Sequence, residues 1–200
     1  MPAEASRLFV FARHAESAAN VAHVVSSDPS RLVALTERGQ AQARALGAQL
    51  ASVHIDLAVG TRLLRTQQTI EIALAGRDVP VLVEPGFDEL RAGDLDGAPM
   101  EAYRSWKRQH APDDRLPHGE SVDDALRRYA DALRRLLART ETVTLVVVHE
   151  LALRHIAAAA AGSPPSPGTD IVNAAPYLFD ERAARRAVAA LDARASSARP

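Results

Sequence analysis

The feature that most constrains the fold is a six-residue run at 143–148, Val-Thr-Leu-Val-Val-Val. Its apolar residues are nearly continuous instead of alternating with polar ones, which is typical of a central parallel strand covered on both faces. A second short run at 8–12, Leu-Phe-Val-Phe-Ala, is too brief for a helix and suits another buried strand. The two runs therefore favour a protein built around a buried sheet.

Strand and helix patterns alternate four times along the chain, which indicates an α/β fold. Besides the two runs above, strands are expected at 56–60, 79–83 and 173–179, and helices at 36–52, 62–75, 98–110, from 121 onward and at 151–161. The prolines around the 79–83 run place that strand at an edge of the sheet. Residues 183–192 fit either a helix or the return strand of a hairpin. The prediction is a three-layer sandwich, with a mostly parallel central sheet and helices on both faces.

The length of 200 residues favours one domain, and no repeat or linker divides the chain. We expect a single domain over 1–192 and a disordered tail at 193–200. Residues 85–120, called the excursion below, are rich in glycine and proline and interrupt the alternation of strands and helices. A segment of this kind inside a domain is typically a small lid or a substrate loop.

The composition excludes several classes of function. The formal net charge is -1, so no global field would attract nucleic acid or an anionic membrane. The absence of cysteine excludes a thiolate nucleophile, a disulfide framework and thiolate metal sites. Arg7 and Arg13 bracket an apolar run far too short for a signal peptide or a membrane span. We therefore expect a cytoplasmic protein, a monomer or homodimer, without nucleic-acid or membrane partners.

Chemically useful side chains follow the predicted strands. Arg13 and His14 end the first strand, and His149 ends the strand at 143–148. Because parallel strands align their carboxyl ends at one edge of a sheet, the two imidazoles can converge there. Arg65 is expected about one turn into the helix that follows the second strand, and Glu89 lies at the start of the excursion. Two imidazoles, two guanidiniums and a carboxyl group are suited to phosphoryl transfer.

A metal site is the alternative that His149 and Glu150 could suggest. The metalloprotease pattern needs a second histidine four residues after the first, so that both lie on one helical face. Position 153 is leucine, and the next histidine is His155, off that face. We therefore expect no metal site.

Six blocks of the sequence resemble, in the right order, those of the histidine phosphatase superfamily, also called the phosphoglycerate mutase-like family. They are Arg-His-Ala-Glu-Ser at 13–17 with Asn20, Leu-Thr-Glu-Arg-Gly-Gln-Ala at 35–41, Thr-Arg-Leu-Leu-Arg-Thr at 61–66 with Thr69, the acidic block at 88–97, Gly-Glu-Ser at 119–121, and Val-Val-Val-His at 146–149. The resemblance covers most of the chain and implies the fold of that family, a phosphoglycerate mutase-like sandwich.

The resemblance also implies roles for the site residues. His14 would be the nucleophile that becomes phosphorylated. Glu89 would protonate the leaving group and then activate water. The residues expected around the phosphoryl oxygens are Arg13, Ser17, Asn20, Arg65 and His149. No metal or other cofactor is implied, because side chains supply the positive charge.

The sequence departs from the family pattern at four positions. Ala15 replaces a glycine, and Thr61 and Thr66 replace a serine and an alanine. Glu150 replaces the glycine that usually follows the second histidine, and its carboxylate would repel a phosphate unless it turned away. We expect Glu150 to point outward or to pair with an arginine such as Arg154.

The function expected from these residues is metal-independent hydrolysis of a small phosphate monoester through a phosphohistidine. In the excursion, His118 and Arg91 are possible substrate contacts. A mutase of the same family is the first alternative, and the short excursion favours hydrolysis over it. The second alternative is a catalytically silent module that only binds phosphorylated ligands or proteins. Such a module should have lost at least one of the main site residues, and this chain keeps His14, Arg65, Glu89 and His149. The sequence does not identify the substrate.

Overall fold

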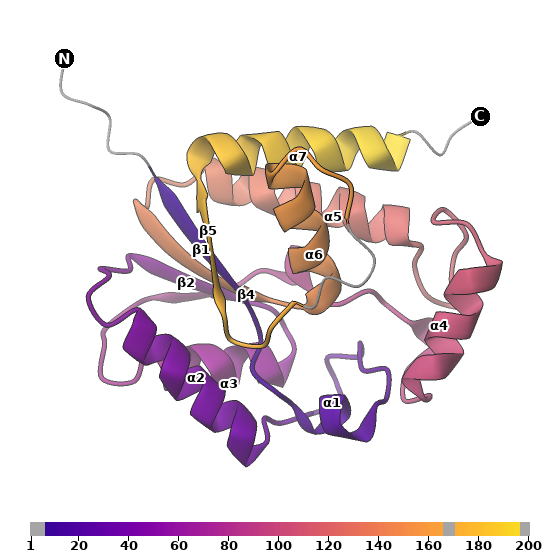
Figure 1. The fold of residues 1–200 in the computed structure, drawn as a ribbon, viewed down its shortest axis with the longest axis horizontal. Coiled ribbons are helices and arrows are strands. Elements are labelled where there is room, and N and C mark those ends of the chain that lie inside the picture. The colour runs from indigo at the N-terminus through magenta and orange to yellow at the C-terminus, as the bar shows by residue number, and fades with distance from the viewer. Residues whose placement is uncertain (1–6, 166–170, 197–200) are drawn as a thin grey trace.

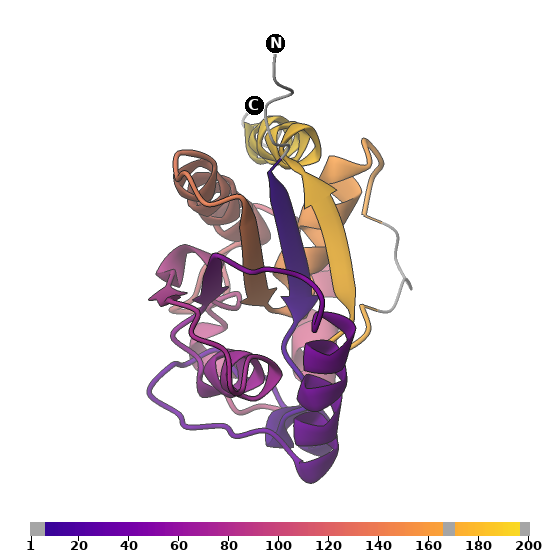
Figure 2. The same ribbon diagram turned by 90° about the vertical axis from the view of Figure 1, so that its left-hand side faces the viewer.

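The computed structural model describes residues 7–165 and 171–196. Within these ranges five strands form one sheet in the order β3-β2-β4-β1-β5. The strands are β1 (Leu8–Arg13), β2 (Leu57–Gly60), β3 (Val81–Val83), β4 (Val143–Val148) and β5 (Pro176–Asp180). The first four in this order are parallel and β5 is antiparallel to β1. In Figure 2, indigo β1 stands between brown β4 and yellow β5. The expected mostly parallel sheet, with the 79–83 strand at its edge, is confirmed.

Helices cover both faces of this sheet. They are α1 (Ala18–Ala22), α2 (Glu37–Gln49), α3 (Leu64–Ala73), α4 (Met100–Gln109), α5 (Val122–Leu137), α6 (Glu150–Ala160) and α7 (Glu181–Ser196), with short 3-10 turns at Pro85–Phe87 and Gly93–Leu95. Figure 1 shows α2 and α3 on one side of the sheet and α5, α6 and α7 on the other. No helix in the described ranges is long and apolar enough to cross a membrane.

The pleat of β1 explains why both faces are covered. Phe9 and Phe11 point into the core that α5, α6 and α7 share, while Val10 and Ala12 point into the core beneath α2 and α3. All four side chains are buried, and so are those of β4 from Thr144 to Val148. A strand buried on both faces has no polar side to alternate with, which is why the 143–148 run is nearly continuous.

The end of the chain differs from expectation. Residues 183–192, which the pattern left open between helix and strand, belong to α7, and this helix continues to Ser196. The expectation of a disordered tail is therefore wrong for 193–196, while 197–200 lie outside the described residues. Ala187, Leu191 and Ala195 form one buried helical stripe, and Arg127 donates a hydrogen bond to the carbonyl of Ala195 at 2.6 Å. These contacts with the core hold the last turn in place.

The excursion is anchored in the main core by Phe87, Leu90 and Leu116, all of which are buried. Beneath it the carboxylate of Glu120, whose side chain is 1% exposed, is paired with the guanidinium of Arg128. Arg128 also donates to the carbonyl oxygens of Gly86 at 3.1 Å and Asp88 at 2.9 Å. One arginine thus holds the segment that leads into Glu89.

Replacing Arg128 with alanine is expected to lower the free energy of unfolding by about 3 kcal/mol, because it leaves the buried Glu120 carboxylate without its main partner. Urea denaturation measures this change. The matched control is Arg134→Ala on the exposed side of the same helix, where the ion pairs with Asp131 and Asp192 are solvated and their loss costs about 1 kcal/mol or less. Equal effects of the two substitutions would contradict the prediction.

Candidate active site

The two histidines lie at the carboxyl ends of adjacent parallel strands. β1 and β4 pair in a register that sets Arg13 opposite Val148, and the backbone N–H of His14 donates to the Val148 carbonyl at 2.8 Å. The residues after each strand, His14 and His149, are therefore neighbours, and their ring centroids are 5.3 Å apart. Both side chains are almost fully buried, at 3% and 0% exposed. The convergence expected from the strand pattern is confirmed.

The ring of His14 is held with one nitrogen as a donor and the other as an acceptor. Nδ1 lies 2.7 Å from the carbonyl oxygen of Ala15 and donates to it, while Arg65 Nε donates to Nε2 at 3.0 Å. Because a guanidinium can only donate, Nε2 carries a lone pair and no proton. Burial, followed by the charge of Arg65, holds the pKa of His14 well below its usual range. His14 is therefore a neutral imidazole whose lone pair is on Nε2, where it accepts the hydrogen bond from Arg65.

His149 is neutral for the same reasons but is held in the opposite tautomer. Arg65 Nη2 donates to its Nδ1 at 3.2 Å, so the proton is on Nε2, which donates to Thr61 Oγ1 at 3.0 Å. The Thr61 hydroxyl lies 3.0 Å from that of Thr66, which in turn donates to the Leu63 carbonyl at 2.9 Å. Burial and then Arg65 hold the pKa of His149 well below its usual range. The two threonines that depart from the family pattern thus support the second histidine.

Arg65 connects the two histidines. It lies in the first turn of α3, which begins at Leu64, so the expectation that it lies a full turn into this helix is wrong. Its side chain is 4% exposed and also donates to the hydroxyl of Ser26 at 3.3 Å and its carbonyl at 2.9 Å. A buried guanidinium fixed at this number of points presents its positive charge at one defined place.

Arg13 contributes a second guanidinium, which is 16% exposed and paired with the carboxylate of Glu150 at 3.0 Å. Arg13 Nη1 donates to the Ile171 carbonyl at 2.9 Å, whereas its buried Nε has no hydrogen-bond partner in the described structure. The other Glu150 oxygen is bound by Arg154. The expected pairing of Glu150 with Arg154 is confirmed. The pairing with Arg13 was not expected, and it places this carboxylate at the site.

Glu89 lies within the electric field of both arginines. Burial raises the pKa of its carboxyl group above the usual range, the charges of Arg65 and Arg13 oppose that rise, and Glu150 adds to it. Among the described contacts, the one hydrogen bond of its carboxyl group is accepted by Oε1 from the backbone N–H of Leu90, at 2.9 Å. Glu89 is thus a carboxyl group near two cations that keeps its proton more readily than an ordinary glutamate.

Ser17 and Asn20 are bonded to each other at the start of α1. The backbone N–H and the hydroxyl of Ser17 both donate to Asn20 Oδ1, at 2.9 and 3.0 Å. Ser17 is 1% exposed, and it caps the helix. Since Oδ1 accepts both bonds, the NH₂ end of Asn20 is the one left to donate to another group.

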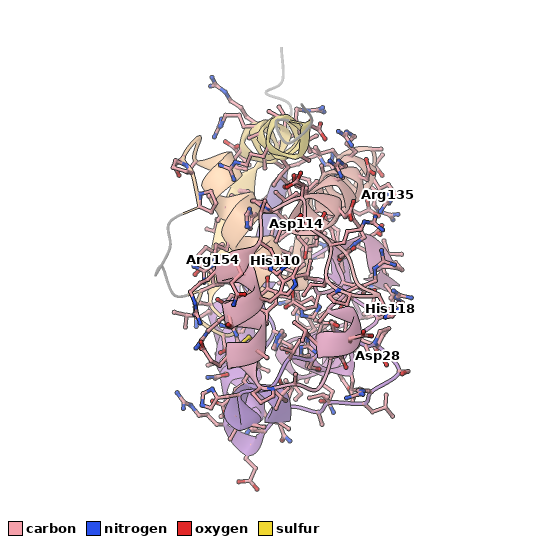
Figure 3. The ribbon with its side chains drawn as sticks, turned by 90° about the vertical axis from the view of Figure 1, so that its right-hand side faces the viewer. Asp28, His110, Asp114, His118, Arg135 and Arg154 are labelled. Carbon is pink, nitrogen blue, oxygen red and sulfur yellow. The ribbon has the colours of Figure 1, made fainter. Side chains whose placement is uncertain are left out.

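His118 and Arg91 of the excursion are exposed side chains that pair with carboxylates. His118 is 85% exposed and pairs with Asp94, and Figure 3 shows it on the opposite side of the view from Arg154. Arg91 pairs with Glu120 and is 63% exposed. Neither has a hydrogen bond or ion pair with the cluster among the described contacts. Their role as possible substrate contacts stays a prediction.

Three contacts at the site were missed by the sequence reasoning. Asn173 Nδ2 donates to the His14 carbonyl at 2.6 Å, Ser26 accepts from Arg65 as described, and Thr69 Oγ1 accepts from the backbone N–H of Ala15 at 3.0 Å. Thr69 belongs to a recognised block, which was a usable signal. Ser26 and Asn173 lie in irregular segments, where no periodic pattern marks a residue for a role.

The model of the histidine phosphatase superfamily (branch 1) matches residues 9–192. A 2,3-bisphosphoglycerate-dependent phosphoglycerate mutase of Methylobacterium radiotolerans is 32% identical, over 74% of this chain and 76% of its own. An adenosylcobalamin/alpha-ribazole phosphatase of Salmonella typhimurium is 31% identical, over 68% and 70%.

Among solved structures, the alpha-ribazole phosphatase from Shigella flexneri superposes with a TM-score of 0.69 at 28% identity, covering 79% of this chain and 81% of its own. With a family match over nearly the whole described chain and a fold in common, the protein belongs to the histidine phosphatase superfamily.

Proposed function

We propose that this protein hydrolyses small phosphate monoesters through a phosphohistidine formed on His14. The observation that carries the proposal is the state of His14, a neutral imidazole whose Nε2 lone pair lies 3.0 Å from the buried guanidinium of Arg65. A nucleophile needs that lone pair, and a phosphoryl group needs the cation beside it. The contact between His14 and Arg65 supplies both the lone pair and the cation.

In the first step, Nε2 of His14 attacks phosphorus and the bond from phosphorus to the ester oxygen breaks. Glu89 gives its proton to the departing oxygen, which leaves as an alcohol. In the second step the Glu89 carboxylate takes a proton from water, whose oxygen attacks phosphorus as the phosphorus–nitrogen bond breaks. Inorganic phosphate leaves, and both His14 and Glu89 return to their starting states.

The phosphoryl oxygens would be held by Arg13, Arg65 and His149. Arg65 offers its Nε and Nη2 groups, which now point at the histidines, and Arg13 has its unpartnered Nε. A phosphate dianion raises the pKa of a neighbouring imidazole, so His149 would take up a proton on Nδ1. The new N–H would donate a hydrogen bond to a phosphoryl oxygen. The NH₂ end of Asn20 is a further donor, with Ser17 holding it in orientation.

The named activities of relatives include both phosphatases and mutases, so phosphoglycerate mutase activity is a second candidate. In a mutase the phosphoryl group returns from the histidine to the bound product instead of to water. Incubation with 3-phosphoglycerate separates the two reactions. We expect any turnover to release inorganic phosphate, and formation of 2-phosphoglycerate as the main product would overturn the assignment as a hydrolase.

The direct test is a panel of phosphate monoesters assayed for phosphate release, together with rapid acid-free denaturation during turnover. We expect release from at least one ester and a phosphoenzyme that survives base, is lost in acid and maps to His14 by peptide mass. Binding of phosphate esters without turnover or phosphoenzyme would instead support a silent binding module.

Thr61 is expected to act as a positioning residue through His149. Thr61→Val keeps the shape of the side chain but leaves the buried Nε2–H of His149 without its acceptor. We expect kcat/KM to fall about tenfold and its pH dependence to change as the His149 tautomers become less distinct. Thr61→Ser keeps the hydroxyl and should remain within about threefold of the wild type. Equal losses in both variants would show that the hydroxyl is not what matters.

A further inference from the structure

Glu150 is the carboxylate that this chain places beside the candidate phosphate site. It occupies the first position of α6, directly after His149, and its side chain is 41% exposed. One oxygen lies 3.0 Å from Arg13 Nη2, and the other is bound by Arg154 one helical turn away. Glu150 therefore competes with any incoming anion for the guanidinium that would hold the phosphoryl group.

The charge of Glu150 also acts on two side chains outside α6. Its charge adds to the rise in the pKa of Glu89. It also contributes, after burial and Glu89, to raising the pKa of Tyr103. Tyr103 is on α4 in the excursion, and Glu89 is at the excursion's start. From its place beside Arg13, the charge of Glu150 therefore acts on groups of the excursion. The leaving group of a bound ester must occupy the side of Glu89, because Glu89 would protonate it.

We infer that Glu150 is a specificity-determining residue that selects phosphate esters whose leaving group is neutral or cationic, and disfavours esters that carry a second anion near the phosphate. This inference rests on the proposed phosphatase activity. The reacting phosphoryl group has its own cations in Arg13, Arg65 and protonated His149. A second anion on the leaving group would instead meet the carboxylate of Glu150 and, in protonated Glu89, no cation.

Two esters of nearly the same shape test this selection. Glycerol 3-phosphate and 3-phosphoglycerate differ in one group, a hydroxymethyl in the first and a carboxylate in the second. The measured quantity is the ratio of their kcat/KM values, in which effects on phosphate binding shared by both esters cancel. O-phosphoethanolamine adds a substrate whose leaving group carries an ammonium.

We expect the wild type to prefer glycerol 3-phosphate and O-phosphoethanolamine over 3-phosphoglycerate. Glu150→Gln keeps the size of the side chain and removes its charge, so the preference for glycerol 3-phosphate should fall about tenfold. Glu101→Gln on α4 removes the same charge from a side chain that is 64% exposed and paired with Arg108. This control should leave the ratio within about twofold of the wild type.

A ratio that does not change in Glu150→Gln, or that falls equally in Glu101→Gln, would overturn the inference while leaving the phosphatase activity established. Failure of the wild type to hydrolyse any ester of the wider panel would overturn the proposed function, and this inference with it. Phosphate release by the wild type distinguishes the two failures, because it is observed in the first and absent in the second.

Discussion

Replacing His14 with alanine is expected to lower kcat for phosphate ester hydrolysis by about 10⁴-fold and to abolish the phosphoenzyme. The reason is geometric as well as chemical. The lone pair of His14 is on Nε2, beside the guanidinium of Arg65 that would stabilise a phosphoryl group. The neighbouring His149 is held in the opposite tautomer, and its Nε2 carries a proton that it donates to Thr61. Initial rates and peptide mapping of the trapped enzyme measure the effect.

The matched control for this variant is His54→Ala. His54 is 89% exposed and pairs with Asp56 at the far end of the sheet from the site, where β2 begins. It should retain activity within about twofold, since surface substitutions of this kind change little. Turnover by His14→Ala within about tenfold of the wild type, in protein with an unchanged unfolding temperature, would exclude His14 as the nucleophile.

Replacing Glu89 with glutamine is expected to produce a loss that depends on the leaving group. An alkyl ester needs a proton on the departing oxygen, so its kcat should fall about 10³-fold. 4-Nitrophenyl phosphate has a leaving group that departs without a proton, so phosphorylation of His14 should be nearly preserved while the second step slows. The expected result is a phosphoenzyme that accumulates in Glu89→Gln with 4-nitrophenyl phosphate, measured as a burst of nitrophenol. Equal losses on both esters, without accumulation, would contradict an acid–base role.

The pH dependence of hydrolysis follows from opposite shifts in the pKa values of His14 and Glu89. The first step needs His14 neutral and Glu89 protonated. Burial lowers the pKa of His14 and raises that of Glu89, so both groups are more often in the required state than ordinary residues would be. For alkyl esters, kcat/KM should fall as pH drops through the lowered His14 pKa and also as pH rises through the raised Glu89 pKa. Glu89→Gln should remove the alkaline fall, because glutamine does not titrate.

The positions of the two histidines could be predicted because local patterns determine them. A short buried run ends at Arg13 and another at Val148, and the carboxyl ends of parallel strands share one edge of a sheet. The residues that follow the two strands, His14 and His149, must therefore lie close together. The helix starts were equally local, since Thr36 and Ser121 each accept a hydrogen bond from the backbone N–H three residues later.

The tautomers of the histidines and the partners of Arg13 could not be predicted, because they depend on contacts between distant segments. Arg65 donates to His14 across 51 residues and to His149 across 84, and Asn173 donates to the His14 carbonyl across 159. No periodic pattern in the sequence predicts contacts between residues so far apart along the chain. The same limit applies to α7, whose last turn is held by Arg127 from another helix.

The contacts of Glu150 depend on both local sequence and tertiary pairing. That a carboxylate follows the second histidine, and that an arginine four residues later on the same helix can pair with it, is already evident from the sequence. The contact of Arg13 with the other oxygen of this carboxylate is evident only in the folded chain. It arises because β1 pairs with β4, which brings together side chains that are 137 residues apart in the sequence.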